Sequence, residues 1–386
     1  MAFQIRELYY ITHIDNLPSI VAEGILSHEL VLSKGLRYTP VYDEQIIAGR
    51  RERTAGGRNL LSFANLYFQA RNAMLYRVLY EKSPNDIVVL GISRDILRRP
   101  DIFISDGGLG SPQSSVLPPQ EGLKNIDSLR KELDSEYWKP EDGSKRKMMA
   151  ECLVPDLVPP DLINTIYVAS HEAAEKVRSM SLPDRLAIVP QMPLFFEPTR
   201  KMSLANNLFL VEGDMFFSKL QTMTISVNCV GIMGKGLASR AKYQFSDVYV
   251  FYQDACRSGR LQMGKPCIYK RENSLDSELA DEPRPVVNGN GVTWFLLFAT
   301  KNHWKELGDF EGIKRGLVWL RENYKKEGIK SLAMPALGCG LGGLDWKDVG
   351  PAICRFLVDL DIPVWIYLPT ERKIPDAQLT REFLLK

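Results

Sequence analysis

The fold of the C-terminal half is decided by SVNCVGIMGKGLASRAK (residues 226–242) and by MPALGCGLGGLDW (residues 334–346). In each stretch a strand-like segment runs into a glycine-rich loop and then into a helical pattern. Glycines let the backbone approach a phosphate closely, and the following helix presents unpaired N–H groups to an anion. Neither stretch matches GxxxxGK[ST] or GxGxxG. Two such loops in one half of the chain predict a diphosphate held between them.

The two halves of the chain differ in the order of their strand-like and helical segments. Residues 205–386 alternate strand-like segments with helical patterns, which is typical of an α/β sandwich. The strand-like segments there are 208–211, 224–228, 293–299, 331–335 and 363–367, and the helical patterns are 236–244, 246–258, 309–327 and 346–359. The N-terminal half has helical patterns near 16–23, 71–78 and 171–180 among strand-like runs at 87–92, 152–154 and 165–168. That mixture predicts an α+β domain.

The length of 386 residues suits two ordinary domains. A proline-rich stretch at about 182–204 reads as a linker, so we expect one domain over 1–198 and another over 199–386. Two further polar loops are expected at 105–122 and 271–291.

Composition excludes several classes of protein. No apolar run approaches the roughly 20 residues that cross a membrane, and the N-terminus lacks a signal-peptide pattern, so we expect a cytoplasmic protein without a membrane partner. The six cysteines form no CxxC pair, which predicts reduced thiols and no metal site.

Three ordered motifs of the C-terminal half carry a family resemblance: NCVGIMGKGLA (228–238), ATKNHW (299–304) and PALGCGLGGLDW (335–346). Over about 205–370 the chain resembles the macrodomain of the DarG antitoxins. The resemblance implies an α/β/α macrodomain with an ADP-ribose pocket, in which Asp214 contacts the adenine. It implies a distal-ribose wall of Asn228, Gly234, Lys235 and Gly236. It implies a diphosphate loop of Gly338, Cys339, Gly340, Leu341, Gly342 and Gly343.

The same resemblance implies that Lys301 is catalytic in removing ADP-ribose from DNA bases. Cleaving that glycosidic bond needs a proton for the leaving base or a nucleophile at the sugar. Apolar neighbours such as Phe298 and Trp304 would desolvate the amine and favour its neutral, nucleophilic form. Asp345 is a second candidate, as an acid or base. The alternative is a macrodomain that binds ADP-ribose without cleaving it.

In the N-terminal half, arginines interleave with aromatic residues. Six arginines (50, 51, 53, 58, 71 and 77) and a single acidic residue, Glu52, lie between Arg50 and Arg77, together with Phe63, Tyr67, Phe68 and Tyr76. Guanidinium groups pair with phosphates and rings stack on bases, so the pattern suits single-stranded nucleic acid or a dinucleotide. A solvated basic face over core aromatics remains an alternative.

Four motifs of this half resemble the DarT family of DNA ADP-ribosyltransferases: YITHIDNLPSIVAEGI (10–25), IIAGRRER (46–53), LYFQARNAMLYRV (66–78) and AECLV (150–154). The resemblance covers about 1–180 and implies a PARP-like α+β fold with NAD as substrate. It implies that the nicotinamide end of NAD lies against His13 and Asn16, or the adjoining Thr12 and Asp15. It also implies a cleft and substrate-side motif of Tyr67, Arg71 and Tyr76.

Catalysis is implied for Glu151 and for one arginine of the 50–53 run, with Arg51 favoured and Arg50 and Arg53 retained. A carboxylate suits this reaction because loss of nicotinamide leaves an oxocarbenium-like sugar whose charge it can stabilise. The segment TAGGRNLLSFAN (54–65) and the histidine-free loop 105–122 depart from many relatives where the acceptor base is read. They leave thymine or guanine open and favour guanine.

Together the two halves predict a fused toxin–antitoxin. The first half would attach ADP-ribose to a base in single-stranded DNA, and the second would remove it from the ADP-ribosylated DNA. An RNA- or protein-directed transferase is the alternative.

Overall fold

A computed structural model describes residues 5–42, 44–139, 142–281 and 285–386 of the chain. The contacts define two compact units, one spanning 1–196 and 278–288, the other spanning 197–277 and 289–386. The segment 278–288 thus joins the first unit, although it lies within the C-terminal half of the sequence. Residues 282–284 of the loop expected at 271–291 lie outside the described residues. The domain boundary expected at 198/199 stays a prediction.

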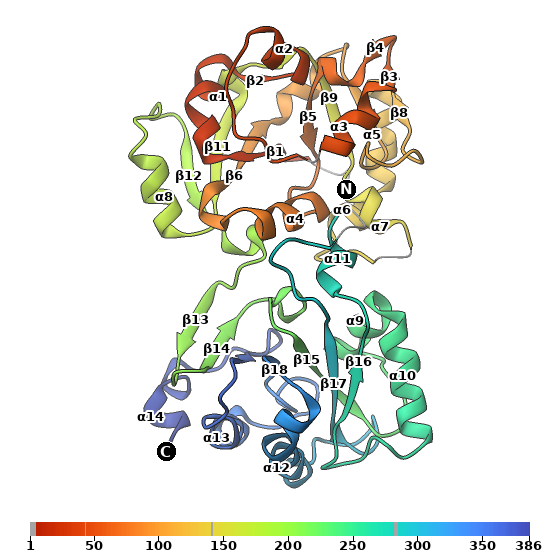
Figure 1. The fold of residues 1–386 in the computed structure, drawn as a ribbon, viewed down its shortest axis with the longest axis vertical. Helices are drawn as coiled ribbons and strands as arrows, with labels where there is room; N and C mark the ends of the chain where they lie inside the picture. The colour runs from red at the N-terminus through yellow and green to blue at the C-terminus, as the bar shows by residue number, and fades with distance from the viewer. Residues whose placement is uncertain (1–4, 43, 140–141, 282–284) are drawn as a thin grey trace. The chain divides into compact units, whose positions relative to one another are not determined.

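The first unit is built on an eight-stranded sheet (Figure 1). The strand order is β12 (Ala187–Pro190), β11 (Ile163–Val168), β6 (Ile87–Ser93), β1 (Glu7–His13), β5 (Phe63–Tyr67), β9 (Glu151–Pro155), β7 (Phe103–Ser105) and β8 (Val116–Leu117). All neighbours are antiparallel except β11 and β12. Two short ribbons pair β2 (Ile25–Leu26) with β10 (Leu157–Val158) and β3 (Thr54–Ala55) with β4 (Arg58–Asn59).

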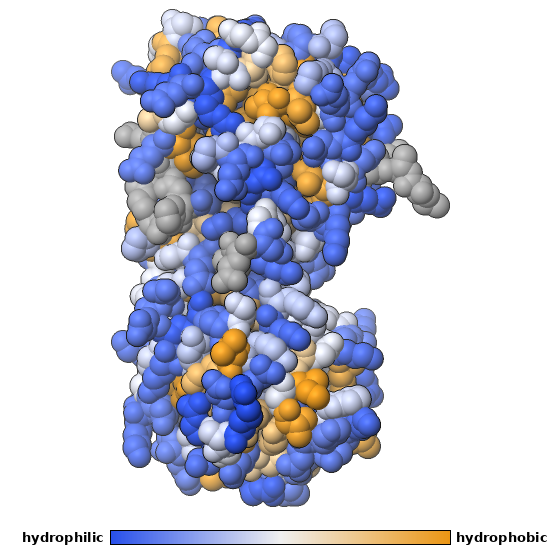
Figure 2. All heavy atoms as spheres, turned by 90° about the vertical axis from the view of Figure 1, so that its right-hand side faces the viewer, coloured by the Kyte–Doolittle hydropathy of each residue, from blue (hydrophilic) through white to orange (hydrophobic). Residues whose placement is uncertain are grey.

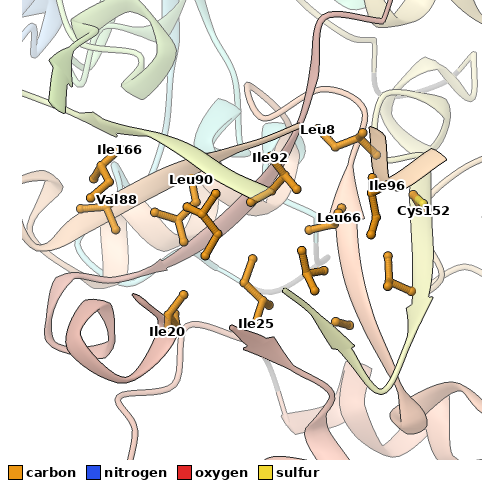
Figure 3. Close-up of a cluster of buried hydrophobic side chains, with 14 of the residues drawn as sticks. Leu8, Ile20, Ile25, Leu66, Val88, Leu90, Ile92, Ile96, Cys152 and Ile166 are labelled. Atoms are coloured by element: carbon orange, nitrogen blue, oxygen red, sulfur yellow. The ribbon is translucent and has the colours of Figure 1, made fainter. Parts of the chain in front are cut away.

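Helices cover both faces of this sheet. The α-helices are α1 (Leu17–Glu23), α2 (His28–Ser33), α3 (Glu44–Arg51), α4 (Ala73–Glu81), α5 (Pro119–Ser128), α6 (Arg130–Leu133), α7 (Ser144–Lys147) and α8 (His171–Arg178). The central strand β6 is apolar and buried through nearly its whole length, because alternate residues enter separate cores. Val88, Leu90 and Ile92 pack with α1 and α8, as Figure 3 shows in part, and Val89 packs with α4 on the opposite face.

The second unit is a three-layer α/β/α sandwich on a seven-stranded sheet. Its order is β13 (Arg200–Ser203), β14 (Leu208–Glu212), β19 (Val364–Tyr367), β18 (Leu332–Pro335), β15 (Thr222–Asn228), β17 (Trp294–Lys301) and β16 (Cys267–Lys270), parallel except at the two edges. Its helices are α9 (Gly236–Gln244), α10 (Ser246–Arg257), α12 (Phe310–Glu327), α13 (Trp346–Leu357) and α14 (Arg381–Leu384); α11 (Leu275–Leu279) ends in segment 278–288.

The same alternation separates the two helical layers of this sandwich. Leu296 and Phe298 of β17 join the core of α12 and α13. Phe295 lies on the other face, with its ring centroid 5.5 Å from that of Phe245 at the junction of α9 and α10. The α+β and α/β/α classes expected from the sequence are therefore confirmed.

Parallel pairing brings the three motif loops of the second unit together. Strands β18, β15 and β17 are neighbours, and their carboxyl ends are Pro335, Asn228 and Lys301. Because parallel strands end at the same edge of the sheet, the loops after them meet there, where open α/β sheets bind ligands.

The strands not predicted from the sequence include the central strands β1 and β5 of the first unit and the edge strands β12, β13 and β16. β12 and β13 fall in the stretch 182–204 that we expected to be a linker, and β16 is short. Edge strands tolerate proline, as at Pro190, and bury little, so their pattern resembles that of a loop. Among the helices of the described residues, none has the length and apolar character needed to span a bilayer.

Candidate active sites

A cavity of about 420 Å³ in the first unit contains the candidate transferase residues. Its walls include residues of β1, β5 and α3 and the first residue of β9, Glu151. The side chain of Glu151 is 1% exposed, and its carboxylate accepts each of the following hydrogen bonds from an N–H group. Arg50 Nη2 lies 2.8 and 2.9 Å from its two oxygens, Asn65 Nδ2 lies 2.8 Å away and the Leu109 N–H lies 2.9 Å away. An ionised carboxylate satisfies such a set, because it accepts at both oxygens and donates at neither.

The sheet register explains the placement of Glu151. β5 and β9 pair so that Tyr67 lies directly opposite Glu151, and directly opposite side chains share a face of the sheet. Asn65 lies two residues before Tyr67 on the same face. Burial raises the pKa of Tyr67 above its usual range, with Glu151 as the next cause. Tyr67 therefore enters the site as a neutral phenol.

Two polar atoms beside Glu151 are buried and have no partner in the described part of the chain: Arg50 Nε and Asn65 Oδ1. An unsatisfied buried polar atom costs on the order of 1–3 kcal/mol. A ligand rich in hydroxyl and phosphate groups supplies both a donor for Asn65 and an acceptor for Arg50. These residues therefore fit the sugar and phosphates of a nucleotide.

Of the three candidate arginines, the structure brings Arg50 to Glu151. Consecutive helix residues point about 100° apart, so only one of Arg50 and Arg51 can face the cavity from α3. Arg51 is exposed, and the favoured assignment of the catalytic role to it is not supported by this geometry. Arg53 binds the carbonyls of Leu109, Ser111 and Ser114 at 2.8, 3.1 and 2.6 Å and so holds the loop expected at 105–122.

The residues expected around nicotinamide divide into two kinds. Thr12 and Asn16 line the cavity, and Asn16 also anchors its rim through two hydrogen bonds with the backbone of Thr39, at 2.8 and 2.9 Å. His13 caps the short 3₁₀ turn Ile14–Asn16 and accepts from the Asp15 N–H at 3.2 Å. His13 and Asp15 thus shape the turn that presents Asn16.

Two residues of the tyrosine motif lie outside the cavity lining. Arg71 stacks on Phe196 with 4.4 Å between the guanidinium carbon and the ring centroid, and its Nε donates to the Pro193 carbonyl. Tyr76 is buried in an aromatic cluster, with its hydroxyl 3.0 Å from that of Tyr80. Only Tyr67 of the three is in the wall, and the wall residues that the sequence did not single out include Asn65, Lys145 and Asp281. The period-two relation of Asn65 to Tyr67 was the one signal that pointed to it.

In the second unit Lys301 ends β17 opposite Asn228 of β15. Its Nζ donates to the Glu306 carbonyl at 2.7 Å and lies 3.5 Å from the Leu341 carbonyl, so the amine lies between two of the motif loops. The apolar shell expected around it is incomplete, because Phe298 is buried in the core and Trp304 is 49% exposed.

Asn228 acts on the backbone of its own loop. Its Oδ1 accepts from the N–H groups of Val230 and Ile232 at 3.0 and 3.4 Å, and its Nδ2 donates to the Ile232 carbonyl at 2.6 Å. The Tyr252 hydroxyl donates to the same Oδ1 at 2.8 Å. Asn228 therefore holds the shape of the loop that leads to α9.

Several glycines of the two loops have backbone conformations that favour glycine. Gly236 (φ 59°) opens α9, and the N-cap residue Lys235 makes no side-chain cap, so no side chain of the cap satisfies the first N–H groups of the helix. Gly338 and Gly343 also have positive φ, at 74° and 75°. A Cβ on Gly342 would lie 2.5 Å from the Gly338 carbonyl oxygen. The loop is therefore compact, and the N–H groups of Cys339, Gly343 and Leu344 bond to carbonyls within it.

The remaining loop residues differ in their exposure. Gly234 and Gly340 are glycines without positive φ, and Cys339 is buried with its thiol pKa raised to about 12 by burial. Leu341 is 60% exposed. Four further apolar side chains of this region are between 44% and 78% exposed: Val230, Ile232, Trp304 and Leu307. On the face drawn in Figure 2, hydrophobic side chains lie in separate small groups among polar ones.

The two candidate acids of this unit are both engaged. Asp214 caps the 3₁₀ turn Met215–Phe217 and pairs with Arg240 at 2.9 Å. Asp345 caps α13 by accepting from the Lys347 N–H at 3.1 Å, a hydrogen bond that is the first cause of its lowered carboxyl pKa. Asp345 is thus an ionised helix cap, and this geometry does not support its expected role as an acid.

Known proteins match both units. Residues 9–196 match the family described as "ssDNA thymidine ADP-ribosyltransferase, DarT", and residues 226–353 match the macro domain family. A "DNA ADP-ribosyl transferase-DNA ADP-ribosyl glycohydrolase fusion protein" of Thermosipho africanus is 53% identical over 382 residues, 98% of each chain. The "DNA ADP-ribosyl glycohydrolase" of Thermus aquaticus is 34% identical over 165 residues, 42% of each chain.

The fold agrees with that of a solved relative. The structure "Thermosipho africanus DarTG in complex with ADP-ribose" superposes with a TM-score of 0.93 at 53% identity, covering 99% of this chain and all of that one. The expected pairing of a DarT-like transferase with a macrodomain is confirmed. This chain belongs to the family of enzymes that fuse a DNA ADP-ribosyl transferase to a DNA ADP-ribosyl glycohydrolase.

Proposed function

We propose that the first unit transfers ADP-ribose from NAD to a base of single-stranded DNA, with Glu151 as the catalytic carboxylate and Arg50 as its partner. The observation that supports this most directly is the Glu151 carboxylate, which is buried at the cavity and held by Arg50, Asn65 and the Leu109 N–H.

The chemistry follows from that arrangement. As the bond between the sugar C1″ and nicotinamide breaks, positive charge develops on the sugar, and a fixed carboxylate stabilises it. The acceptor nitrogen then bonds to C1″, and its proton passes to a base, for which Glu151 is the candidate. Arg50 holds the carboxylate in place through both of its oxygens, and the Nε of Arg50 suits a phosphate oxygen of NAD.

The acceptor base is proposed to be thymine. The family matched by residues 9–196 is described as acting on thymidine in single-stranded DNA. That description supports thymine over the guanine that the loop 105–122 suggested from the sequence.

For the second unit we propose that ADP-ribose binds across the two glycine loops and that Lys301 acts on the glycosidic bond. Backbone N–H groups at Gly236 and at Gly340–Gly342 support a diphosphate between the loops. Lys301 lies at the same sheet edge, where it would protonate the departing base or attack C1″ before water releases ADP-ribose. Asp214 is proposed as the adenine contact.

Oligonucleotide labelling tests both halves. The Lys301→Ala chain with NAD and single-stranded DNA should accumulate an ADP-ribosylated strand, and mass spectrometry should find the group on thymine. Adding Glu151→Gln should reduce that labelling by about 100-fold or more, because the charge that stabilises the transition state is removed. Undiminished labelling would exclude Glu151 as the catalytic group, and a mark on guanine would reverse the base assignment.

A further inference from the structure

Residues 278–281, which are grouped with the first unit, make specific contacts within it. Trp138, fully buried, donates its indole N–H to the Leu279 carbonyl at 3.0 Å. Lys145 Nζ donates to the carbonyls of Glu278 and Ala280 at 2.9 and 3.0 Å. These contacts fix the described start of the segment against the wall of the cavity that holds Glu151.

The contact of most interest is the ion pair between Arg77 and Asp281. Arg77 Nε lies 2.8 Å from Asp281 Oδ1, and the two side chains are 5% and 2% exposed. Both residues line the same cavity as Glu151. A carboxylate from the C-terminal half of the sequence thus forms part of the transferase cavity.

This pair is incompletely satisfied. Arg77 Nη2 and Asp281 Oδ2 are both buried without a partner in the described part of the chain, while Glu81 takes Arg77 Nη1 at 2.6 Å. Burial raises the pKa of the Asp281 carboxyl, with Arg77 offsetting only part of the effect. A one-point buried ion pair contributes little to stability once the loss of hydration is counted. The geometry therefore suits a carboxylate that occupies the binding site of another anion better than one whose role is to stabilise the fold.

Lys145 adds a second basic side chain to the cavity wall that contains Arg77. It lines the cavity, its partners from the segment are two neutral carbonyls, and burial lowers its pKa. A guanidinium with a free Nη2 and an amine held by carbonyls suit a phosphodiester. Such a group carries one negative charge, like a carboxylate, but offers two oxygens to the fork of an arginine.

We propose that Arg77 and Lys145 form a phosphate subsite of the transferase cavity, and that segment 278–281 occupies it in the resting protein, with Asp281 in the place of the phosphate. The proposal rests on the transferase function proposed above. It makes Asp281 a built-in competitor of substrate, which must withdraw before a phosphate binds. The acceptor strand is the expected source of that phosphate, and the diphosphate of NAD is the other source that the test separates.

The test uses the full chain in the Lys301→Ala background, so that product persists. Initial labelling rates are measured against oligonucleotide and against NAD for the parent and for Asp281→Asn, which keeps the shape of the side chain. Freeing Arg77 should lower the KM for the substrate that supplies the phosphate by about tenfold, as one charge-assisted contact is worth, with kcat unchanged. If the strand is the source, the salt dependence of its log KM should steepen by roughly 0.7.

Two further variants keep the test decisive. Glu81→Gln removes the other carboxylate on Arg77 without touching the segment, and should leave both KM values near those of the parent. Arg77→Met with Asp281→Asn should abolish the gain, because it replaces both charged members of the buried pair by neutral side chains. Unchanged KM values in Asp281→Asn, a fall in its kcat, or an equal gain in Glu81→Gln would each overturn the proposal. Labelling by the parent reports the transferase function separately.

Discussion

Arg50 and Arg51 are neighbours with different surroundings, and the difference lies in the direction of each side chain. Arg50 binds Glu151 within a buried network, whereas Arg51 is exposed at the last position of α3. The run of arginines could be recognised in the sequence, because three guanidinium groups lie within four residues there. The helix rotation of about 100° per residue then decided which one reaches the carboxylate.

Replacing each of these two arginines in turn by alanine tests which of them supports catalysis. Arg50→Ala should lower kcat/KM for DNA labelling by about 100-fold, because the partner that holds Glu151 is lost. Arg51→Ala removes the same charge next to it and serves as the matched control, with a change expected within about threefold. Steady-state labelling in the Lys301→Ala background measures both, and a larger loss in Arg51→Ala would return the role to that residue.

At the scale of elements, parallel strands and tight glycine loops build the ADP-ribose site that we propose for the second unit. Strands β18, β15 and β17 end at one sheet edge, so motifs as far apart in sequence as 228–238 and 335–346 meet there. The backbone within each loop is as important as its side chains. Asn228 holds one loop by three hydrogen bonds to its backbone, and Gly342 packs against Gly338 in the other.

Gly342→Ala tests this packing. The added methyl would overlap the Gly338 carbonyl, displace the loop and weaken ADP-ribose binding by about tenfold or more, measured by calorimetry. Gly291→Ala is the control, since its Cβ meets nothing within 4 Å and its φ is not positive. Equal affinities for the two variants would show that loop packing does not set binding.

At the scale of the whole molecule, the two activities together define a cycle. The first unit consumes NAD and leaves ADP-ribose on a strand, and the second returns the strand unmodified. Summed over both steps, NAD and water become nicotinamide and ADP-ribose, and the DNA is regenerated. Fusion on one chain keeps the two catalysts at equal concentration, so neither can act without the other present.

The cycle predicts DNA-dependent NAD hydrolysis. The protein without substitutions should release free ADP-ribose in many-fold excess over the oligonucleotide supplied, and chromatography measures this release. Lys301→Ala should instead stop after stoichiometric modification of the target bases. Release that does not require DNA, or a Lys301→Ala chain that still turns over in excess, would contradict the linked cycle.

The sequence by itself determined the classes of both folds, the glycine loops, and Glu151 and Lys301 as candidates. The fold classes and the glycine loops follow from local chemistry, namely strand and helix periodicity and the φ freedom of glycine. The two catalytic candidates follow from the resemblance of their motifs to the DarT and DarG families. Tertiary structure decided which of the residues meet. It selected Arg50 by helix rotation and brought Asn65 and Tyr67 to Glu151 by strand register. It also gave segment 278–288 to the first unit, where Asp281 faces Arg77 some 200 residues away in sequence. Such pairings arise from the burial of distant side chains in a common cavity, which no local pattern records.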